Sequence, residues 1–265
     1  MLELEVKNLT KTFATDKSRI SVLDNVSFSV GNDEFICLVG PSGCGKSTLL
    51  RIIAGLEKAD SGSVLFHGEP ITKPNPKIAM VFQFFGLLPW KTALENIELP
   101  LEVLGLKKTD RKQIAREYLQ MVKLEGFENA YPHDLSGGMK QRVGIARALA
   151  LKPEVLLMDE PFSSLDELTA KTLRKLVLDI WRDPALPTNT FIMVSHNVEE
   201  AVFMADRVIV MSPRPGKIIG EVKIGIPRPR ESHLRDQIYF SFVDKVIEIL
   251  KKSKNNDKKE GIFVT

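Results

Sequence analysis

The sequence predicts an α/β fold in which a mixed, largely parallel sheet is joined to an antiparallel β subdomain and a helical subdomain. Three observations support this prediction. Continuously apolar runs of strand length, at Phe35–Val39 and Val155–Met158, are typical of buried parallel strands. Apolar and polar residues alternate near the N-terminus, and strand patterns are scarce between residues 87 and 150.

Alternating apolar residues mark the antiparallel part. Alternate side chains of a strand share one face, so this pattern suits strands with one buried face. The alternating sets are Leu2, Leu4 and Val6, then Val26, Phe28 and Val30, and then Val64 and Phe66.

Helical spacing dominates the middle of the chain. Ile114, Tyr118 and Val122 fall on one helical face, which predicts a helical subdomain over about 87–150. Beyond Pro153 the parallel pattern returns, with strands expected at 155–158, 190–195 and 207–211 and helices over 173–180 and ending near Ala205. Prolines and arginines interrupt regular structure over 212–230, and a last amphipathic helix is expected around 243–250. We therefore divide the chain into 1–225 and a C-terminal helix with a basic tail, 226–265.

Composition limits the possible functions. The 265 residues are 43% hydrophobic, enough for a sizeable core, and their net charge is only +3. No apolar run approaches the roughly 20 residues needed to span a bilayer, and no secretory signal is expected at the start, so the cytoplasm is the expected compartment. Cys37 and Cys44 suggest reduced thiols rather than a disulfide framework. No nucleic-acid partner is expected, and the C-terminal lysines indicate a solvated tail; they are Lys251, Lys252, Lys254, Lys258 and Lys259.

A glycine-rich loop follows the first apolar strand. Residues 40–47 read Gly-Pro-Ser-Gly-Cys-Gly-Lys-Ser and fit the phosphate-loop pattern G-x-x-x-x-G-K-[ST], with a strand before it and a helix expected from about Lys46. Gly40, Gly43 and Gly45 let backbone N–H groups surround phosphate oxygens, and the helix adds its positive N-terminal dipole. Lys46 is suited to the β- and γ-phosphates and Ser47 to Mg²⁺. The alternative is a glycine-rich turn that merely starts a helix.

Two acids end the strand Val155–Met158. Asp159 lies at the carboxyl edge of the predicted sheet, where ligands bind in open α/β folds, and suits Mg²⁺ bound through water. Glu160 is better placed to accept a proton from an attacking water. Consecutive acids after a strand are otherwise a solvated helix cap, but Lys46 in the same chain favours catalysis.

A second glycine-rich helix start lies between these motifs. Residues 135–142 read Leu-Ser-Gly-Gly-Met-Lys-Gln-Arg, and a helix is expected to run on through Ala150. Ser136 offers a hydroxyl, and Gly137 and Gly138 allow close approach of backbone N–H groups, so a γ-phosphate would be well received. The chain thus carries half of each of two ATP sites.

Over residues 1–225 the sequence closely resembles the nucleotide-binding subunits of ATP-binding cassette (ABC) transporters. The resemblance rests on motifs in a fixed order: the phosphate loop 40–48, Gln83, the signature 135–142, Asp159-Glu160, Ser164-Leu165-Asp166 and Ser195-His196. It implies a P-loop NTPase core that hydrolyses ATP with Mg²⁺. It also implies a head-to-tail homodimer in which each ATP lies between the phosphate loop of one subunit and the signature of the other.

The resemblance also implies roles for single residues. In the phosphate loop it adds Pro41, Ser42, Cys44 and Thr48 to the nucleotide-binding residues. Gln83 contacts Mg²⁺ and water and reports the nucleotide state to the membrane partner.

Three further roles come from the same resemblance. His196 bonds the γ-phosphate and positions water, and Asp166 lines the dimer interface. Phe13 stands where the family stacks an aromatic ring on adenine, although it could instead be a core residue of the antiparallel sheet. His67, His133 and His233 are interpreted as structural.

Two stretches resemble an importer branch that takes up nitrate, sulfonates, taurine, bicarbonate or pyrimidine precursors. They are Leu87–Trp90, followed by Leu94–Ile97, and Met211–Lys217. The apolar segment Phe84–Trp90 either packs against the helical subdomain or forms a groove for a partner helix. Phe84-Phe85 and Asn197 depart from residues common in the family, which affects the substrate branch and the partner contacts rather than hydrolysis.

The importer resemblance implies partners and a location. We expect separate membrane permease subunits, an extracytoplasmic solute-binding protein, and association with the cytoplasmic face of the cell membrane. Two alternatives stay open: a soluble ABC-type switch in repair, translation or cofactor assembly, and an exporter subunit. The transported solute is not encoded in these motifs.

Overall fold

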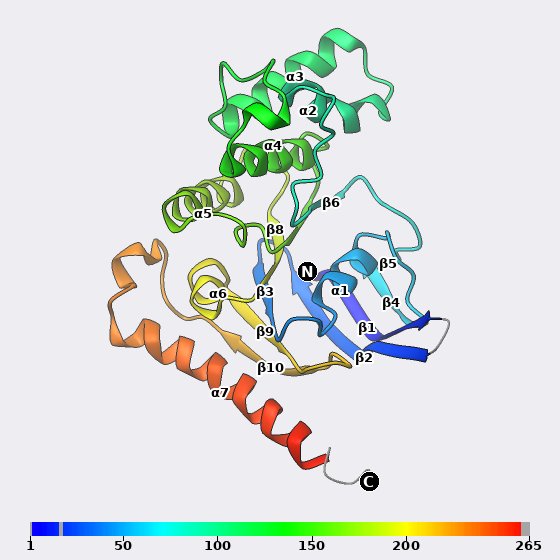
Figure 1. Ribbon diagram of the computed structural model, residues 1–265, viewed down its shortest axis with the longest axis vertical. Coiled ribbons are helices and arrows are strands. Elements are labelled where there is room, and N and C mark those ends of the chain that lie inside the picture. Colours follow the sequence, from blue (N-terminus) through cyan, green and yellow to red (C-terminus); the bar gives the residue numbers. More distant parts are fainter. Residues whose placement is uncertain (1, 16–17, 261–265) are drawn as a thin grey trace. The chain divides into compact units, whose positions relative to one another are not determined.

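The computed structural model describes residues 2–15 and 18–260, and the chain divides into two compact units. The first unit comprises Met1–Pro74 and Ile192–Thr265, and the second comprises Asn75–Phe191. The boundary falls inside strand β8 (Thr190–Ser195), which therefore contributes residues to both units (Figure 1).

The first unit contains an antiparallel sheet. Its strands follow the order β2-β1-β4-β5, where the bounds are β1 (Leu2–Thr15), β2 (Ser18–Gly31), β4 (Ser61–Phe66) and β5 (Glu69–Pro70). Val6 pairs with Phe28 on one side and with Val64 on the other. The antiparallel strands predicted from alternation are thus confirmed.

A second set of strands in this unit leads to the phosphate loop. Its order is β10-β9-β3-β8, with β3 (Phe35–Val39), β9 (Arg207–Met211) and β10 (Ile218–Lys223). β3 runs parallel to β9, with Cys37 opposite Val208, and all of its residues are buried. Helix α1 (Lys46–Ile53) follows the loop after β3, and helix α6 (Val198–Met204) follows β8 and packs on β3 and β9.

Two expectations for the C-terminal part were wrong. Strand β10 lies in the stretch expected to be irregular, and it forms because its residues pair antiparallel with β9, with Gly220 opposite Val210. Helix α7 (Gln237–Glu260) is much longer than expected, since Tyr239, Val243 and Val246 bury one face of it at helical spacing. Residues 261–265 of the proposed basic tail, and the side chains of 254–260, lie outside the described structure.

The second unit holds the strand order β8-β7-β6 and the helical part. β6 (Ile78–Val81) and β7 (Val155–Asp159) are parallel, with Ala79 opposite Leu156. Helices α2 (Ala93–Glu102), α3 (Lys108–Met121) and α4 (Gly137–Leu149) pack against one another, and α5 (Glu167–Trp181) packs on α4 (Figure 1). The predicted face of α5 is buried, with Leu173 and Val177 fully enclosed.

A buried asparagine fixes the segment that precedes α2. The side chain of Asn96 is fully buried. Its Nδ2 donates to the carbonyl oxygens of Leu88, Lys91 and Thr92 at 3.2, 3.0 and 2.9 Å, and its Oδ1 accepts from Leu88 N at 2.8 Å. Residues 88–92 belong to no strand or helix, so this side chain supplies the partners that their backbone requires.

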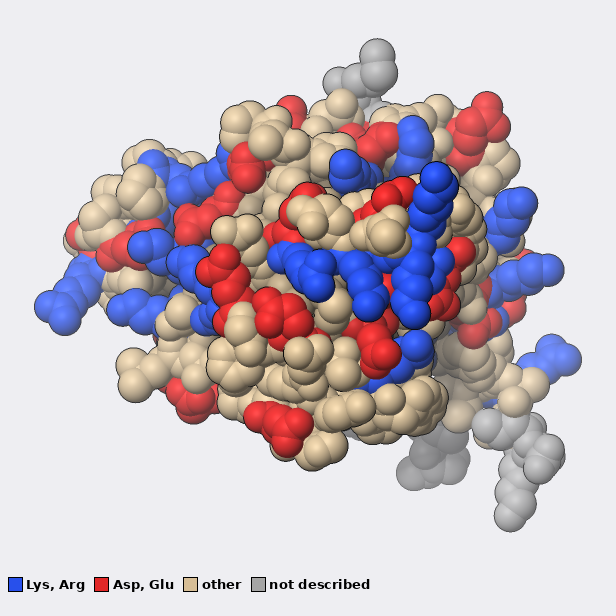
Figure 2. Space-filling model, turned by 90° about the horizontal axis from the view of Figure 1, so that it is seen from above, with Lys and Arg blue, Asp and Glu red and all other residues tan. Residues whose placement is uncertain are grey.

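Charges of both signs are mixed on one face of the molecule. Figure 2 shows Lys and Arg side chains interleaved with Asp and Glu side chains on the face in view. Within residues 2–15 and 18–260, no helix has the length and apolarity needed to cross a membrane.

We expect Asn96→Asp to lower the free energy of unfolding by about 3 kcal/mol or more, because a buried carboxylate would face carbonyl oxygens to which Nδ2 now donates. Urea unfolding at neutral pH measures this loss. Asn75→Asp is the matched control, because Asn75 only accepts, through Oδ1 from Lys77 N at 3.0 Å, and a carboxylate keeps that bond. Equal stability of the two variants would contradict the anchoring role of Asn96.

Candidate functional site

The phosphate loop of the first unit is shaped by glycines with positive φ. Gly43 and Gly45 have φ of 75° and 105°. A Cβ on Gly45 would lie 2.7 Å from Leu23 Cδ2 and 2.9 Å from the carbonyl oxygen of Val22, so a side chain is excluded there. Gly45 is the N-cap of α1, so the backbone N–H groups at the helix start adjoin the loop.

The ammonium of Lys46 lies within the loop. Lys46 is only 5% exposed, and its Nζ donates to the carbonyl oxygens of Gly40 and Pro41 at 2.8 and 2.9 Å. The Sγ of Cys44 is 3.8 Å from the same nitrogen. Burial raises the pKa of the Cys44 thiol, although the Lys46 charge acts in the opposite direction. The loop therefore holds a desolvated cation beside a neutral thiol.

The other residues of the loop are more accessible. Ser42 and Gly43 are exposed, and Ser47 and Thr48 at the start of α1 are half-buried. Hydroxyls and backbone N–H groups at this helix start form a surface suited to an anion.

His196 follows the last residue of β8 and is exposed. Hydrogen bonds on both sides of it fix the local backbone: Ser195 Oγ donates to Glu200 Oε2 at 2.6 Å and accepts from Asn197 N at 3.0 Å. Asn197 caps α6, since its Oδ1 accepts from Glu200 N at 3.1 Å.

Phe13 lies on β1 with 39% of its surface exposed, so its ring is not enclosed in the core. The Nζ of Lys11 lies 4.8 Å from the ring centroid, within range of a cation–π interaction. The same ammonium is held by Glu57 Oε1 at 2.6 Å and by the Lys58 carbonyl at 2.7 Å. The ring face is therefore shared with a fixed cation, a partner that the sequence did not suggest.

In the second unit, a glutamine and a glutamate meet at the end of β7. Gln83 Nε2 donates to Glu160 Oε2 at 3.1 Å, and Asp159, the last residue of β7, is only 4% exposed. Glu160 has φ of 46°, a left-handed conformation that non-glycine residues adopt at a cost of about 1–3 kcal/mol. Ser163 donates to the Glu160 carbonyl from both N and Oγ, at 3.3 and 3.0 Å, and supports this turn.

The glycine-rich start of α4 packs against the start of α5. Ser136 caps α4, with its Oγ accepting from Met139 N at 3.3 Å. A Cβ on Gly138 would lie 2.3 Å from Thr169 Cγ2, so only glycine permits this contact. Asp166 caps α5 through Thr169 N at 3.0 Å, and hydrogen bonds from Thr169 lower the pKa of the Asp166 carboxyl. The structure thus brings Ser136 to Gly138 and Asp166 together at adjacent helix starts.

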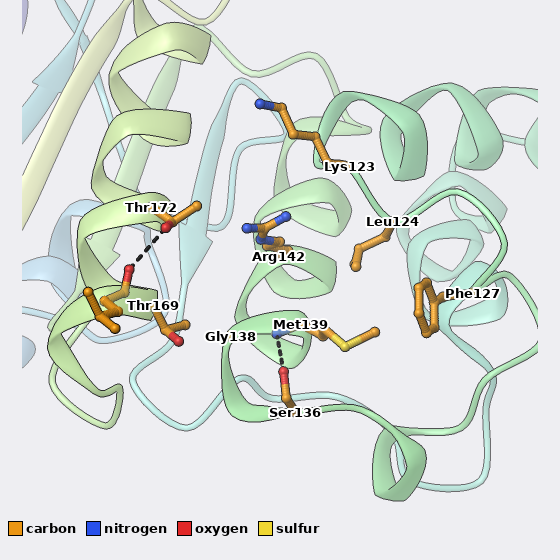
Figure 3. Close-up of a pocket in the computed structure, with 10 residues that line it drawn as sticks. Lys123, Leu124, Phe127, Ser136, Gly138, Met139, Arg142, Thr169 and Thr172 are labelled. Carbon is orange, nitrogen blue, oxygen red and sulfur yellow. Dashed lines mark hydrogen bonds between the residues drawn. The ribbon is translucent and has the colours of Figure 1, made fainter.

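A cavity of about 400 Å³ adjoins this pair of helix starts (Figure 3). Figure 3 shows Ser136 just before α4, Met139 and Arg142 on α4, and Thr169 and Thr172 on α5. Lys123, Leu124 and Phe127 complete this lining after α3. Met139 and Arg142 were not among the predicted site residues, although their spacing of three and six residues from Ser136 on a helix indicates a shared face.

An arginine binds the segment that follows Gln83. Arg147 of α4 donates to the carbonyl oxygens of Gly86 and Phe85 at 2.6 and 3.0 Å. Phe84 and Trp90 nevertheless expose 78% and 70% of their surface. The backbone of this segment is therefore anchored, while its aromatic rings remain accessible.

Comparisons with known proteins agree with these motifs. Residues 23–163 match the ABC transporter family. An uncharacterized ABC transporter ATP-binding protein of Methanocaldococcus jannaschii, MJ0412, is 47% identical, covering 94% of this chain and 92% of that protein. The nitrate import ATP-binding protein NrtD of Synechocystis sp. is 40% identical, covering 98% and 99%. The aliphatic sulfonates import ATP-binding protein SsuB of Bacillus cereus is 41% identical, covering 88% and 90%.

A solved structure is also similar. The dimeric post-hydrolysis state of the ATP-binding cassette MJ0796, bound to ADP and Pi, superimposes with a TM-score of 0.74 and 35% identity over 83% of this chain and 98% of that chain. The fold and the family predicted from the sequence are therefore confirmed. The chain belongs to the ABC transporter family and is an ATP-binding cassette that hydrolyses ATP.

Proposed function

We propose that this ATPase powers the import of a small solute through separate membrane permease subunits, at the cytoplasmic face of the membrane. The observation that carries the proposal is the presence, in one chain, of a phosphate loop and a signature helix start together with importer-like relatives. Relatives that are 40–41% identical are named for nitrate, bicarbonate and sulfonate transport. We expect a solute of this class, a small anion or polar organic molecule, delivered by an extracytoplasmic binding protein.

Lys46 is assigned to the β- and γ-phosphates of ATP. Its ammonium donates to the carbonyl oxygens of Gly40 and Pro41. When ATP binds, charged phosphate oxygens can take the place of these neutral acceptors and form stronger hydrogen bonds. Phe13 is assigned to the adenine ring, since its exposed face offers stacking. The remaining loop residues contribute N–H and hydroxyl groups.

Mg²⁺ fits the oxygen-bearing side chains in this set. Ser47, Gln83 and Asp159 offer a hydroxyl, an amide oxygen and a carboxylate, the hard ligands that this ion prefers. The Nε2 of Gln83 is engaged with Glu160, which leaves the amide oxygen of Gln83 for a metal or water. When bound, Mg²⁺ would neutralise charge on the phosphates.

Glu160 is assigned as the general base. A water molecule attacks the γ-phosphorus, Glu160 takes a proton from it, and the bond to the β-phosphate oxygen breaks to leave ADP and phosphate. The hydrogen bond from Gln83 holds the carboxylate in one orientation. His196 is assigned to the γ-phosphate and the attacking water.

The signature is assigned to the ATP bound by a second copy of the chain. The hydroxyl of Ser136 and the N–H groups of Gly137 and Gly138 suit a γ-phosphate at the start of α4. Arg142 and Lys123 line the adjoining cavity, and their positive charge would favour the approach of that nucleotide. Asp166 lies beside this helix start and would face the partner. ATP would then join the two copies, and hydrolysis would release them.

The exposed aromatics Phe84 and Trp90 are assigned to the permease. Arg147 and Asn96 hold the backbone on either side, so the rings are presented by an ordered segment. Large apolar side chains that stay exposed on an anchored backbone are typical of a docking site for a partner helix.

Purification of the chain with its partners from gently solubilised native membranes tests the proposal. Mass spectrometry of every co-purifying polypeptide should identify a polytopic permease, and nitrate, bicarbonate and sulfonates should then be tested for stimulation of hydrolysis. Reproducible recovery of soluble partners alone would reject import and favour an ABC-type switch. Export of a solute from loaded vesicles would contradict the proposed direction of transport, which is import.

We expect Glu160→Gln to lower kcat by about 100-fold or more, because the attacking water loses its proton acceptor. ATP affinity should be retained, and an ATP-bound dimer should accumulate in size-exclusion chromatography. Glu117→Gln, an exposed change on α3, is the control and should behave as the unmodified chain. Normal turnover in Glu160→Gln would contradict the assigned base.

We expect the double variant Phe84→Ala, Trp90→Ala to lose permease-dependent transport by about tenfold or more, as for central aromatic residues of an interface. Basal hydrolysis by the isolated chain should stay within about twofold, because a docking surface is not part of the chemistry. Leu56→Ala removes an exposed apolar side chain elsewhere, in the first unit, and serves as the control. Equal loss of transport and basal hydrolysis would instead indicate that the two rings stabilise the fold of the chain.

A further inference from the structure

The segment between β10 and α7 donates side-chain hydrogen bonds to the backbone of helix α6. α6 is short, running from Val198 to Met204, and it starts two residues after His196. The last carbonyls of any α-helix have no partner within the helix and must find one elsewhere. In this chain, two arginines of the C-terminal segment provide those partners.

Arg230 is the central residue of this arrangement. Its side chain is only 2% exposed. Nη1 donates to the carbonyl oxygens of Val202 and Phe203 in the last turn of α6, at 2.8 and 3.2 Å, and to that of its C-cap Ala205 at 2.6 Å. The Nε of Arg230 donates to the carbonyl oxygen of Ile226, in the same C-terminal segment, at 3.1 Å. One buried guanidinium thus joins the C-terminal segment to the end of α6.

Arg228 extends the same contact toward β3. Its Nη2 donates to the Met204 carbonyl at 2.6 Å and to Asp206 Oδ1 at 2.7 Å. Asp206 in turn accepts from Phe35 N through Oδ2 at 3.1 Å, and its own N donates to the Phe35 carbonyl at 2.7 Å. Phe35 begins the strand that ends at the phosphate loop. The end of α6 is therefore fixed relative to the base of β3.

Tyr239 holds the opposite end of α6. This side chain, on α7, is 3% exposed, and its hydroxyl donates to the Glu199 carbonyl in the first turn of α6 at 2.7 Å. α6 is consequently bound at both ends by residues 228–239. Because Asn197 caps the helix immediately after His196, any rotation or sliding of α6 would displace the histidine backbone.

We propose that Arg230 and Tyr239, together with Arg228, are positioning residues that hold His196 in the position required for ATP hydrolysis. The C-terminal segment is thereby part of the ATPase machinery. This inference rests on the role proposed for His196. The group formed by Arg228, Arg230 and Tyr239 is called the α6 clamp. In this proposal the clamp acts on His196 only through α6.

The test combines kinetics with the ring resonances of the histidines, measured by NMR on the full chain. The chain has four histidines, so each signal can be assigned by single substitution; they are His67, His133, His196 and His233. Arg230→Lys keeps the charge but not the fork of donors, and it should lower kcat about tenfold with ATP affinity unchanged. Tyr239→Phe deletes one hydroxyl and should lower kcat about threefold.

In both variants the His196 resonance should shift while those of His67 and His133 stay in place. Arg235→Lys, an exposed change in the same segment, is the matched control and should alter neither readout. Should Arg230→Lys fail to fold, Tyr239→Phe decides the question, because it removes a single bond from the packed core. An unshifted His196 resonance, or ATP affinity that falls together with kcat, would overturn the proposal.

A variant of His196 itself separates this inference from the proposed function. In a His196→Ala background, the clamp variants should cause no further loss of kcat, and a full additional loss would overturn the proposal. If His196→Ala alone hydrolyses ATP normally, the role assigned to His196 fails, and with it the catalytic part of the inference. The NMR shift would still report whether the clamp positions that residue.

Discussion

Two helices in this chain begin at glycines where a Cβ would collide with neighbouring atoms, and the proposed nucleotide chemistry depends on both. At Gly45 a Cβ would collide with Leu23 and the Val22 carbonyl, and at Gly138 it would collide with Thr169. The close packing places the two helix starts against neighbouring elements, and the N–H groups of a helix start are suited to an anion. Steric exclusion of side chains thus shapes both helix starts, and positive side chains add to each: Lys46 at the first, and Lys123 and Arg142 beside the second.

Single polar side chains support several connecting segments of the chain. Asn96, Arg147 and Arg230 each donate to carbonyl oxygens of chain segments that leave a strand or a helix. Buried backbone groups need partners, and one polar side chain with several donors can satisfy them at sites where ladders and helices end. The result is an ordered connecting segment that keeps its outward-facing side chains available. Phe84 and Trp90 are the clearest instance, since their rings are exposed next to an anchored backbone.

Local patterns in the sequence predicted most of the fold. The buried strand at Phe35–Val39, the strand Thr190–Ser195 and the strand Arg207–Met211 were predicted with the bounds observed, because each is a short apolar run between clear breaks. β10 was missed because its residues become a strand only through pairing with β9. The length of α7 was underestimated because its face is buried by contacts with β9, β10 and α6, which local periodicity does not show.

The same distinction applies to the candidate site. Spacing located the phosphate loop, the signature and the acids after β7, since these motifs are local. Contacts between distant residues were not predictable from spacing: Gln83 with Glu160, separated by 77 positions, and Arg147 with Gly86, separated by 61. The left-handed backbone of Glu160 was also invisible in the sequence, because glutamate gives no signal for positive φ. Local motifs therefore predict the groups to which chemistry is assigned, whereas the residues that contact and orient those groups are found only from the fold.

This separation explains why the motifs do not identify a solute. The relatives NrtD and SsuB are named for different solutes, nitrate and aliphatic sulfonates, yet they are 40% and 41% identical to this chain. Hydrolysis of ATP involves no atom of a transported molecule. The residues that bind nucleotide therefore need not differ between transporters of different solutes. Sequence differences in an ATPase subunit that depend on the solute must lie in the surface that contacts its membrane partner. In this chain, under the proposed docking, that surface is the anchored segment bearing Phe84 and Trp90. The identity of the permease, rather than further similarity in the cassette, is therefore the information that would specify the solute.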